Sequence, residues 1–259
     1  MLTANRTTTA TNRDIAHYEA AYQQASFEPI QAALRKRIVV AQLKSWQAKR
    51  VLEVGCGMVP LFTEYTDFEH FVIVEPGSQF SRNARNLSKD DSRITIITDY
   101  LEHACAAGEL SAGTFDAIVV SGLLHEIPNP QDVLMNLHEL CDSQTRLHIN
   151  VPNARSVHRL LALEMGLIDD IYRLSDRQQL LHQHATFDIE QLVSLCQACG
   201  YQVIGQGSYF IKPFTHDQMQ TLMNQGLINE QILEGLMGIE KYMPGLGSEI
   251  YLNLAPELR

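Results

Sequence analysis

Val51-Leu52-Glu53-Val54-Gly55-Cys56-Gly57 is a short apolar run that ends on two glycines. The run predicts a buried strand that leads into a tight turn, because glycine adopts backbone conformations that other residues avoid. Glycines at such a turn let a nucleotide-type ligand approach the backbone closely. Residues 51–57 therefore predict the first strand of an α/β sheet, with a ligand site at its carboxyl end.

A second strand end carries an acid at a matching distance. Phe71-Val72-Ile73-Val74 is apolar and leads directly to Glu75, followed by Pro76 and Gly77. Glu75 lies about 20 residues after Glu53, the spacing at which an acid after the second strand accepts hydrogen bonds from ribose hydroxyls. The two strand ends together predict a nucleoside site better than either does alone.

The order of the elements predicts the fold. Apolar runs alternate with stretches of helical periodicity, which indicates a doubly wound, mostly parallel sheet with helices on both faces. We expect a seven-stranded sheet in which the last two strands form a hairpin-like pair at the end of the chain. The predicted strands are residues 50–54, 70–75, 93–98, 115–120, 145–151, 201–210 and 248–254.

Two helical regions extend this sheet. Residues 1–47 are predicted to form an N-terminal helical cap, with helical periodicity from about Arg13 to Gln47, and residues 48–259 form the main domain. Residues 152–186 break the alternation of strand and helix, with helices expected over Ser156–Met165 and Ser175–His182. An insertion that follows a strand in an α/β protein commonly covers the ligand, so we expect a lid here. A further helical stretch is expected from about Thr215 to Lys241.

Local signals predict two helix starts. Asn129 is expected to cap a helix that opens at Pro130, and Asp188 with Gln191 is expected to form a box-like cap. The Cys196-x-x-Cys199 pair lacks a second ligand pair, and His182-Gln183-His184 lacks a third ligand. We therefore interpret the two cysteines as core residues and expect no metal.

Composition limits the partners. The chain has 259 residues, 45% of them hydrophobic, and a formal net charge of -10. This charge would repel a phosphate backbone, so nucleic acid is not expected as a partner. No signal peptide or membrane span is recognised. The five cysteines fit a reducing compartment, so we expect a cytoplasmic protein. We expect it to act on a small molecule, and a homodimer is possible.

From about Leu34 to Leu140 the chain resembles the class I S-adenosylmethionine-dependent methyltransferases, a Rossmann-like family. It is similar to the ubiquinone-type small-molecule methyltransferases within it. Besides Glu53 and Glu75, the resemblance rests on Ile-Ile-Thr-Asp99-Tyr-Leu and on residues 114–128. It implies S-adenosyl-L-methionine as cofactor and transfer of its methyl group to an oxygen or nitrogen. The cofactor-binding residues that it implies are Arg35, Glu53, Gly55, Gly57, Glu75, Pro76, Asp99, Tyr100, Leu101 and Ser121.

The sequence departs from the family pattern at two points. Val59 stands where the family usually has a third glycine, and Pro60 argues against a nicotinamide dinucleotide, which needs a small residue there. The usual Glu-His order after the fourth strand appears as His125-Glu126. In the ubiquinone-type methyltransferases that the chain resembles, an arginine in the helix before the first strand binds the carboxylate of the cofactor. Arg35 stands at the matching position, and Arg37 is the alternative candidate for this role.

His125 is the candidate catalytic base, because the family motif brings it near the methyl group and an unperturbed imidazole titrates near neutrality. A histidine that only shapes the cofactor pocket is the alternative. Two alternatives to a small-molecule enzyme also stay open, a protein methyltransferase and a catalytically inactive cofactor-binding regulator. The candidate substrate residues are Tyr18, Tyr22, Glu126, Asn150, Asn153, His158, Tyr209 and Lys212. Further polar candidates on the lid and tail are Arg159, His182, His184, His216 and Lys241.

Overall fold

The computed structural model describes residues 27–175, 178–179 and 183–258. Within them, no helix is long and apolar enough to cross a membrane. The candidate residues Tyr18 and Tyr22, and His182, lie outside the described residues, as does the helical periodicity predicted before residue 27.

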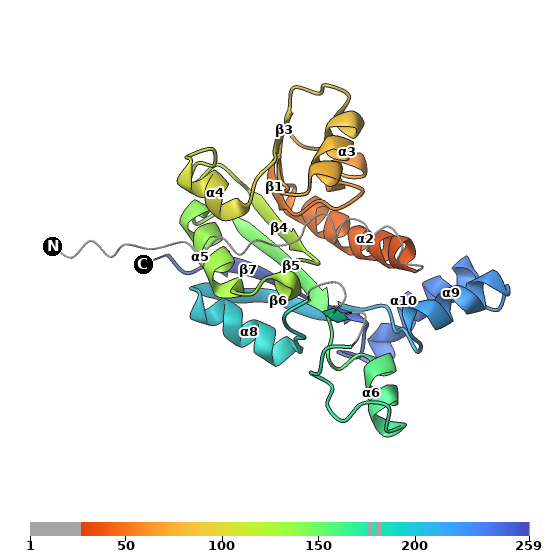
Figure 1. Ribbon diagram of the computed structural model, residues 1–259. Helices are drawn as coiled ribbons and strands as arrows, with labels where there is room; N and C mark the ends of the chain where they lie inside the picture. The colour runs from red at the N-terminus through yellow and green to blue at the C-terminus, as the bar shows by residue number, and fades with distance from the viewer. Residues whose placement is uncertain (1–26, 176–177, 180–182, 259) are drawn as a thin grey trace.

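A seven-stranded sheet forms the centre of the molecule, as predicted (Figure 1). The strand order is β3-β2-β1-β4-β5-β7-β6. The first five strands pair in parallel, whereas β7 runs antiparallel to both β5 and β6. The expected C-terminal pair is therefore confirmed. The strands are β1 Arg50–Val54, β2 His70–Val74, β3 Ile94–Ile97, β4 Ala117–Ser121, β5 Arg146–Pro152, β6 Tyr201–Tyr209 and β7 Glu249–Pro256.

Helices cover both faces of the sheet because successive strand residues point to opposite sides. Leu52 packs in one core with α4 Leu101–Ala106, α5 Pro130–Leu140 and α8 Ile189–Ala198. Val51 packs in the other core with α2 Glu28–Trp46 and α3 Ser78–Ser88. The reversal of strand order at β1 and β4 leaves a crevice at their carboxyl ends, where ligands bind in this architecture.

The predicted helix starts are confirmed in one case and wrong in detail in the other. Asp188 Oδ1 accepts a hydrogen bond from the Gln191 amide at 2.8 Å and caps α8. At α5, Pro130 occupies the first turn as expected, but the Asn129 side chain forms no capping bond. Cys196 and Cys199 are buried free thiols, which confirms that they are core residues.

The helical stretch expected over residues 215–241 is confirmed, and it is divided. The structure has α9 His216–Asn224, then α10 Glu230–Gly238, and then the 3-10 helix η3 Ile239–Tyr242. Gly226 between them has a φ of 74°, a left-handed conformation that ends the first helix. Two further 3-10 helices, η1 Leu61–Thr63 and η2 Leu124–Glu126, follow β1 and β4.

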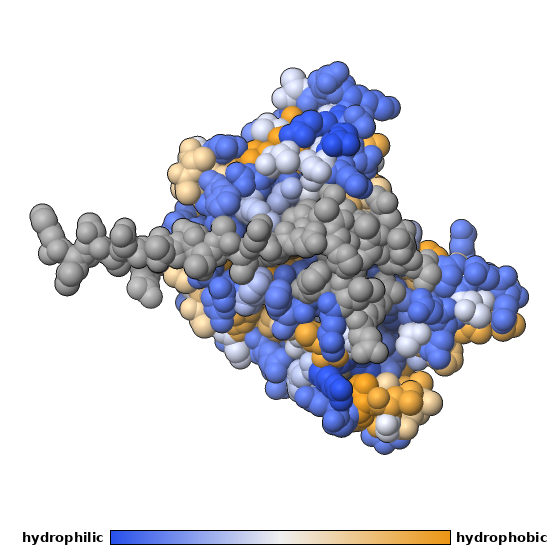
Figure 2. All heavy atoms as spheres, in the orientation of Figure 1, coloured by the Kyte–Doolittle hydropathy of each residue, from blue (hydrophilic) through white to orange (hydrophobic). Residues whose placement is uncertain are grey.

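The region expected to be a lid contains α6 Val157–Glu164, which extends away from the sheet (Figure 1). None of the residues of α6 is fully buried. An apolar cluster lies over α6 on the surface (Figure 2), where Leu161, Met165 and Leu167 are exposed. The second predicted lid helix, Ser175–His182, lies partly outside the described residues, so a lid role stays a prediction.

Candidate functional site

The glycine turn after β1 takes the conformation that its sequence predicts. Gly55 has a φ of 77° and Gly57 a φ of 56°, both in the left-handed region. A Cβ atom at Gly55 would lie 3.4 Å from the Leu123 side chain, close to ordinary van der Waals contact. The turn therefore needs glycine for its backbone conformation.

Glu75 holds this turn against the end of β2. Its Oε2 accepts hydrogen bonds from the amides of Cys56 at 3.0 Å and Gly57 at 3.4 Å, and its Oε1 accepts one from Gly77 at 2.7 Å. The residue is only 5% exposed. A carboxylate has about four acceptor sites, so these bonds are compatible with the predicted contact to ribose hydroxyls.

Glu53 lies beneath the same turn. The Leu61 amide donates to its carboxyl group, at 3.0 Å to Oε2 and 3.3 Å to Oε1. Burial disfavours the charged form and raises the pKa of Glu53 to about 8. Without ligand, this carboxyl group is therefore mostly protonated near pH 7, and its predicted contact with the cofactor stays a prediction.

Asp99 follows β3 and is more open to solvent than Glu53 or Glu75. Its Oδ1 accepts a hydrogen bond from the Tyr100 amide at 2.7 Å and lies 2.9 Å from Nδ1 of His103. His103 also meets the Tyr100 ring edge-on, with centroids 5.7 Å apart. Sequence reasoning missed His103, although its position four residues after Asp99 could have indicated it. Leu101 is buried in the core below, and Pro76 is half-buried.

Ser121 ends β4 and binds across to β5. Its Oγ lies 3.0 Å from Nδ2 of Asn150, which also contacts His148 at 3.3 Å. Asn150 is fully buried beneath the sheet edge and does not line the cavity described below. Its position thus gives no support to the predicted substrate contact.

Arg35 reaches the same edge from α2. Its guanidinium forms a bidentate pair with Glu249, with Nε to Oε2 at 2.8 Å and Nη2 to Oε1 at 2.6 Å, and Glu28 lies 3.3 Å from Nη2. A Cβ atom on Gly122 would lie 3.2 Å from Nη1 of Arg35. The competing candidate Arg37 instead pairs with Glu234 at the exposed surface. Of the two arginines, Arg35 is thus the one beside the end of β4.

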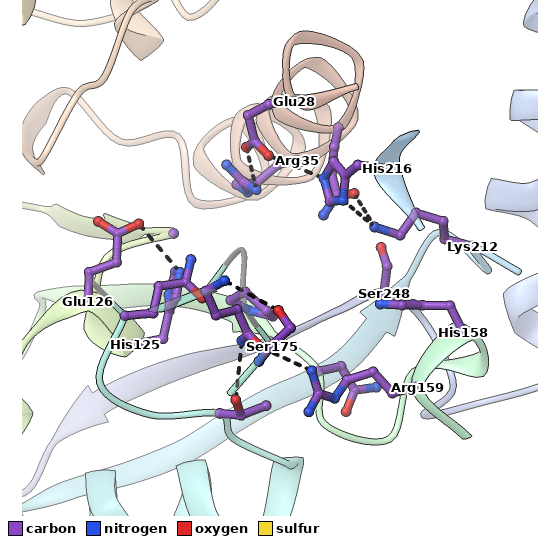
Figure 3. A pocket seen from close by; sticks show the side chains of 17 residues that line it. Glu28, Arg35, His125, Glu126, His158, Arg159, Ser175, Lys212, His216 and Ser248 are labelled. Carbon is purple, nitrogen blue, oxygen red and sulfur yellow. Dashed lines mark hydrogen bonds and ion pairs between the residues drawn. The ribbon is translucent and has the colours of Figure 1, made fainter. Parts of the chain in front are cut away.

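A cavity of about 140 Å³ lies next to Arg35 and Gly122 (Figure 3). We call it the acceptor cavity. Its walls come from segments far apart in the sequence. The lining residues are Glu28, Gln31 and Arg35 of α2, Gly122, His125 and Glu126 after β4, Pro152, Asn153, His158 and Arg159, then Ser175, Gln178, Gln183 and Thr186, and finally Lys212, His216 and Ser248.

His125 is buried in the wall of this cavity, only 4% exposed. Burial, and then the charge of Arg35, lowers its pKa to about 3. The expectation of a base that titrates near neutrality is therefore corrected, since the ring is neutral and weakly basic at pH 7. Its Nε2 lies 3.6 Å from Oε1 of Glu126, and its Nδ1 has no hydrogen-bond partner among the described residues.

The other substrate candidates divide into two groups. Glu126, Asn153, His158 and Lys212 line the acceptor cavity. Asn153 also donates to the Gly245 and Gly247 carbonyls, which ties it to the loop before β7. Tyr209 is buried outside the lining and donates to Glu249. Sequence reasoning missed Glu249, because only the pairing of β7 with β5 and β6 brings it to Arg35.

The carboxyl edge of the parallel strands combines the glycine turn at Gly55 and Gly57, the carboxyl groups of Glu53, Glu75 and Asp99, and the Arg35 guanidinium. We call it the cofactor edge. These groups suit a ligand with a nucleoside at one end and an amino acid at the other. In the part of the chain that the structure describes, no group of three or more His, Cys, Asp or Glu side chains is placed to hold a metal ion.

Comparison with protein families identifies one matching model. Residues 23–206, more than half of the chain, match the model described as methyltransferase domain. None of the curated protein sequences compared with the chain matches it.

Solved structures share the fold over nearly the whole chain. The plantazolicin methyltransferase BamL, in complex with a triazolic desmethylPZN analog and S-adenosylhomocysteine, has a TM-score of 0.59 at 16% identity, covering 94% of this chain and 97% of that one. The N-methyltransferase NodS from Bradyrhizobium japonicum, in complex with S-adenosyl-l-homocysteine, has a TM-score of 0.55 at 10% identity, covering 93% and 99%. A possible histamine N-methyltransferase from Thermotoga maritima has a TM-score of 0.57 at 13% identity, covering 92% and 99%.

Proposed function

The chain belongs to the class I S-adenosylmethionine-dependent methyltransferases, and we propose that it methylates an oxygen or nitrogen of a small-molecule metabolite. The acceptor cavity is the observation that carries the small-molecule part of this proposal. It lies beside Arg35 and Gly122 at the cofactor edge, and its volume of about 140 Å³ suits a small acceptor better than a folded protein surface.

When bound, S-adenosylmethionine supplies a methyl group on a positively charged sulfur. Glu53, Glu75, Asp99 and Arg35, with the glycine turn, are the residues that would hold it. The enzyme's own contribution is then to orient the acceptor atom and keep water out, which can account for several kcal/mol of the barrier.

His125 is placed to orient the acceptor. Its ring is neutral at pH 7, so Nδ1 either donates a hydrogen bond to the acceptor or accepts one from it. This is a positioning role, and it replaces the proton removal near neutrality that the sequence suggested. A neutral acceptor amine already exposes a lone pair and releases its extra proton to water after transfer, so it needs no strong base. An acceptor hydroxyl must lose its proton to water before or during transfer.

Two of the structural neighbours act on small molecules according to their names, BamL on plantazolicin and the Thermotoga maritima protein possibly on histamine. The net charge of -10 points in the same direction, because it disfavours nucleic acid as a substrate.

Replacement of His125 tests the proposal. We expect His125→Ala to leave the affinity for S-adenosylhomocysteine within about threefold and to lower kcat about 10- to 100-fold, the loss of an orienting hydrogen bond. The assay incubates the enzyme with S-adenosylmethionine and a cellular metabolite extract and follows products that gain one CH₂ unit by mass spectrometry. His70→Ala, at the opposite end of β2, is the control.

Absence of S-adenosylhomocysteine binding to the unaltered protein would contradict cofactor use. Mass gain on protein chains alone, with none in the metabolite fraction, would overturn the small-molecule proposal. Unchanged kcat in His125→Ala would remove His125 from the positioning of the acceptor.

A further inference from the structure

Four side chains in the wall of the acceptor cavity carry buried polar atoms with no hydrogen-bond partner among the described residues. They are Nδ1 of His125, Nδ1 of His158, Oε1 of Gln183 and Oγ of Ser248. An unpartnered buried polar atom costs about 1–3 kcal/mol, and folded proteins contain few of them. Their concentration around one cavity indicates a ligand that supplies the missing hydrogen bonds.

Arg159 adds a charge to this wall. Its Nε donates to the Ile171 carbonyl at 2.9 Å, Nη1 to Oε1 of Gln178 at 3.0 Å, and Nη2 to the Arg173 carbonyl. All these acceptors are uncharged, and in the described part of the chain no carboxylate forms an ion pair with Arg159. A guanidinium has five N–H groups, so two remain for a ligand.

The charge of Arg159 is also poorly solvated. Burial lowers the pKa of this guanidinium, and the charge of Asp170 offsets the effect only in part. A partly buried arginine that is held by neutral groups and borders a cavity is suited to binding a carboxylate or phosphate with two parallel hydrogen bonds.

Other cations gather at the same end of the cavity. The pKa of His158 is lowered well below its usual range, by burial first and then by the charges of Lys212, His216 and Arg159. Lys212 is only 2% exposed, and its Nζ lies 3.0 Å from both Oε1 of Gln31 and Nδ1 of His216. Lys212, His216 and Arg159 therefore all act on His158 with positive charge.

Two carboxylates also line the cavity, and one of them contacts His216 of the cationic group. Glu28 is within 3.3 Å of both Arg35 and His216, and Glu126 stands beside His125. Figure 3 shows Glu126 and His125 on one side of the cavity, with His158, Arg159 and Ser248 on the other. The cavity thus has a cationic end and, beside the cofactor edge, an end with His125.

We propose that the methyl acceptor is an acidic small molecule, whose carboxylate or phosphate binds Arg159 and Ser248 while its oxygen or nitrogen nucleophile lies beside His125. This inference rests on the proposed function, since it assigns the substrate class of the same site. The Ser248 hydroxyl and the remaining Arg159 N–H groups donate to the anion.

Substrate pairs that differ only in charge test the proposal. The probes are hydroxylated and aminated benzoic acids, the carboxamide of each acid, and the corresponding phenyl phosphates, with release of S-adenosylhomocysteine as the readout. We expect kcat/KM to be at least about tenfold higher for an acid than for its amide, the value of one charged hydrogen bond. The carboxylate and phosphate series together show which anion the cavity accepts.

Variants at Arg159 locate the effect. Arg159→Gln is expected to raise KM for the acid about 10- to 100-fold and to leave KM for the amide unchanged, and Arg159→Lys is expected to recover part of the loss. Arg155→Gln removes the same charge from an exposed position outside the cavity and should change neither value. Because Arg159 also holds backbone carbonyls, each variant is checked by its affinity for S-adenosylhomocysteine.

Direct binding provides a readout that needs no turnover. The protein loaded with S-adenosylhomocysteine is titrated with benzoate and with inorganic phosphate by calorimetry. Ser248→Ala, which removes no hydrogen bond seen among the described residues, should weaken binding of the preferred anion about threefold or more.

Equal kcat/KM for acids and amides, or equal losses for both in Arg159→Gln, would overturn the proposal while the methyltransferase function stands. The same conclusion follows if no probe turns over and neither benzoate nor phosphate binds the loaded protein. Failure of S-adenosylhomocysteine to bind would instead overturn the function on which the proposal rests.

Discussion

The cofactor edge and the acceptor cavity lie side by side and are built in different ways. At the cofactor edge, Glu75 accepts three backbone amides from segments that adjoin it in the sheet, and its oxygens are well satisfied. In the wall of the acceptor cavity, His125 and Ser248 each have a buried polar atom with no hydrogen-bond partner in the described residues. An edge held mainly by backbone groups keeps its shape without ligand, whereas a cavity with unsatisfied side chains is poised for one.

The pair of Arg35 and Glu249 joins the two regions. Arg35 lies beside Gly122 at the end of β4, and Glu249 begins β7 directly after Ser248. Substitution of Glu249 and titration of the buried histidines test how the two regions contribute to stability. Substitution of Glu75 tests the affinity for the cofactor.

The largest expected effect is on stability. Glu249→Ala leaves Arg35 without its bidentate partner in a site where the Glu249 side chain is fully buried, and should lower the free energy of unfolding by about 3–5 kcal/mol. Urea denaturation measures the change. Glu234→Ala, which removes the exposed partner of Arg37, is the matched control and should have little effect on stability. Equal losses in the two variants would show that the junction is not held by this pair.

A smaller effect is expected from acid. Burial lowers the pKa of His125 to about 3 and of His148 to about 4, and that of His158 falls in the same direction. Below the unfolded value of about 6.5, the unfolded chain binds more protons at these three rings, so stability is lost as the pH falls.

Glu53 opposes the histidines. With a folded pKa of about 8 it retains a proton that the unfolded chain releases above about 4.5, so its contribution is lost as the pH rises through 8. Between about pH 4.5 and 6.5, His125 and His148 less Glu53 leave a net difference of one proton, or about 1.4 kcal/mol per pH unit, and His158 adds to it in the same direction. Urea midpoints of the ligand-free protein should therefore be highest near pH 6.5 and lower at pH 5 and 8. A flat profile from pH 6.5 to 5 would contradict neutral, buried histidines.

The smallest effect concerns cofactor affinity. Glu75→Gln replaces one acceptor oxygen by an NH₂ group that faces backbone amides, and should weaken binding of S-adenosylhomocysteine about 10- to 100-fold in calorimetry. Glu69→Gln, an exposed position just before the other end of β2, should have no effect. If both variants bind equally well, the cofactor edge does not depend on this carboxylate.

Much of the fold could be predicted from local patterns. Residues 50–54 and 70–75 alternate with helices and end on turn residues, and the structure has parallel strands there. Over residues 215–241 the pattern predicted helical structure correctly, but not its division between α9 and α10 near Gly226. Helix ends depend on single backbone conformations, which periodicity does not report.

The candidate site was predicted unevenly for a related reason. Glu75 and the glycines could be proposed because each lies at a strand end that the sequence marks. Arg159 was only one of several polar candidates after the fifth strand, and Ser248 was not identified, because nothing in its neighbourhood distinguishes it from a surface residue. Asn150 and Tyr209 were predicted as substrate contacts, but neither lines the cavity.

The sequence by itself determined the cofactor edge, because the spacing of strand ends and the conformational needs of glycine are local properties. Only the tertiary structure decided the acceptor cavity. It brings together residues from α2, η2, α6 and the start of β7, and it buries His125 enough to lower the ring's pKa to about 3. Burial and pairing between distant segments set the charge and the hydrogen bonds of a side chain, and neither can be read from its neighbours in the chain.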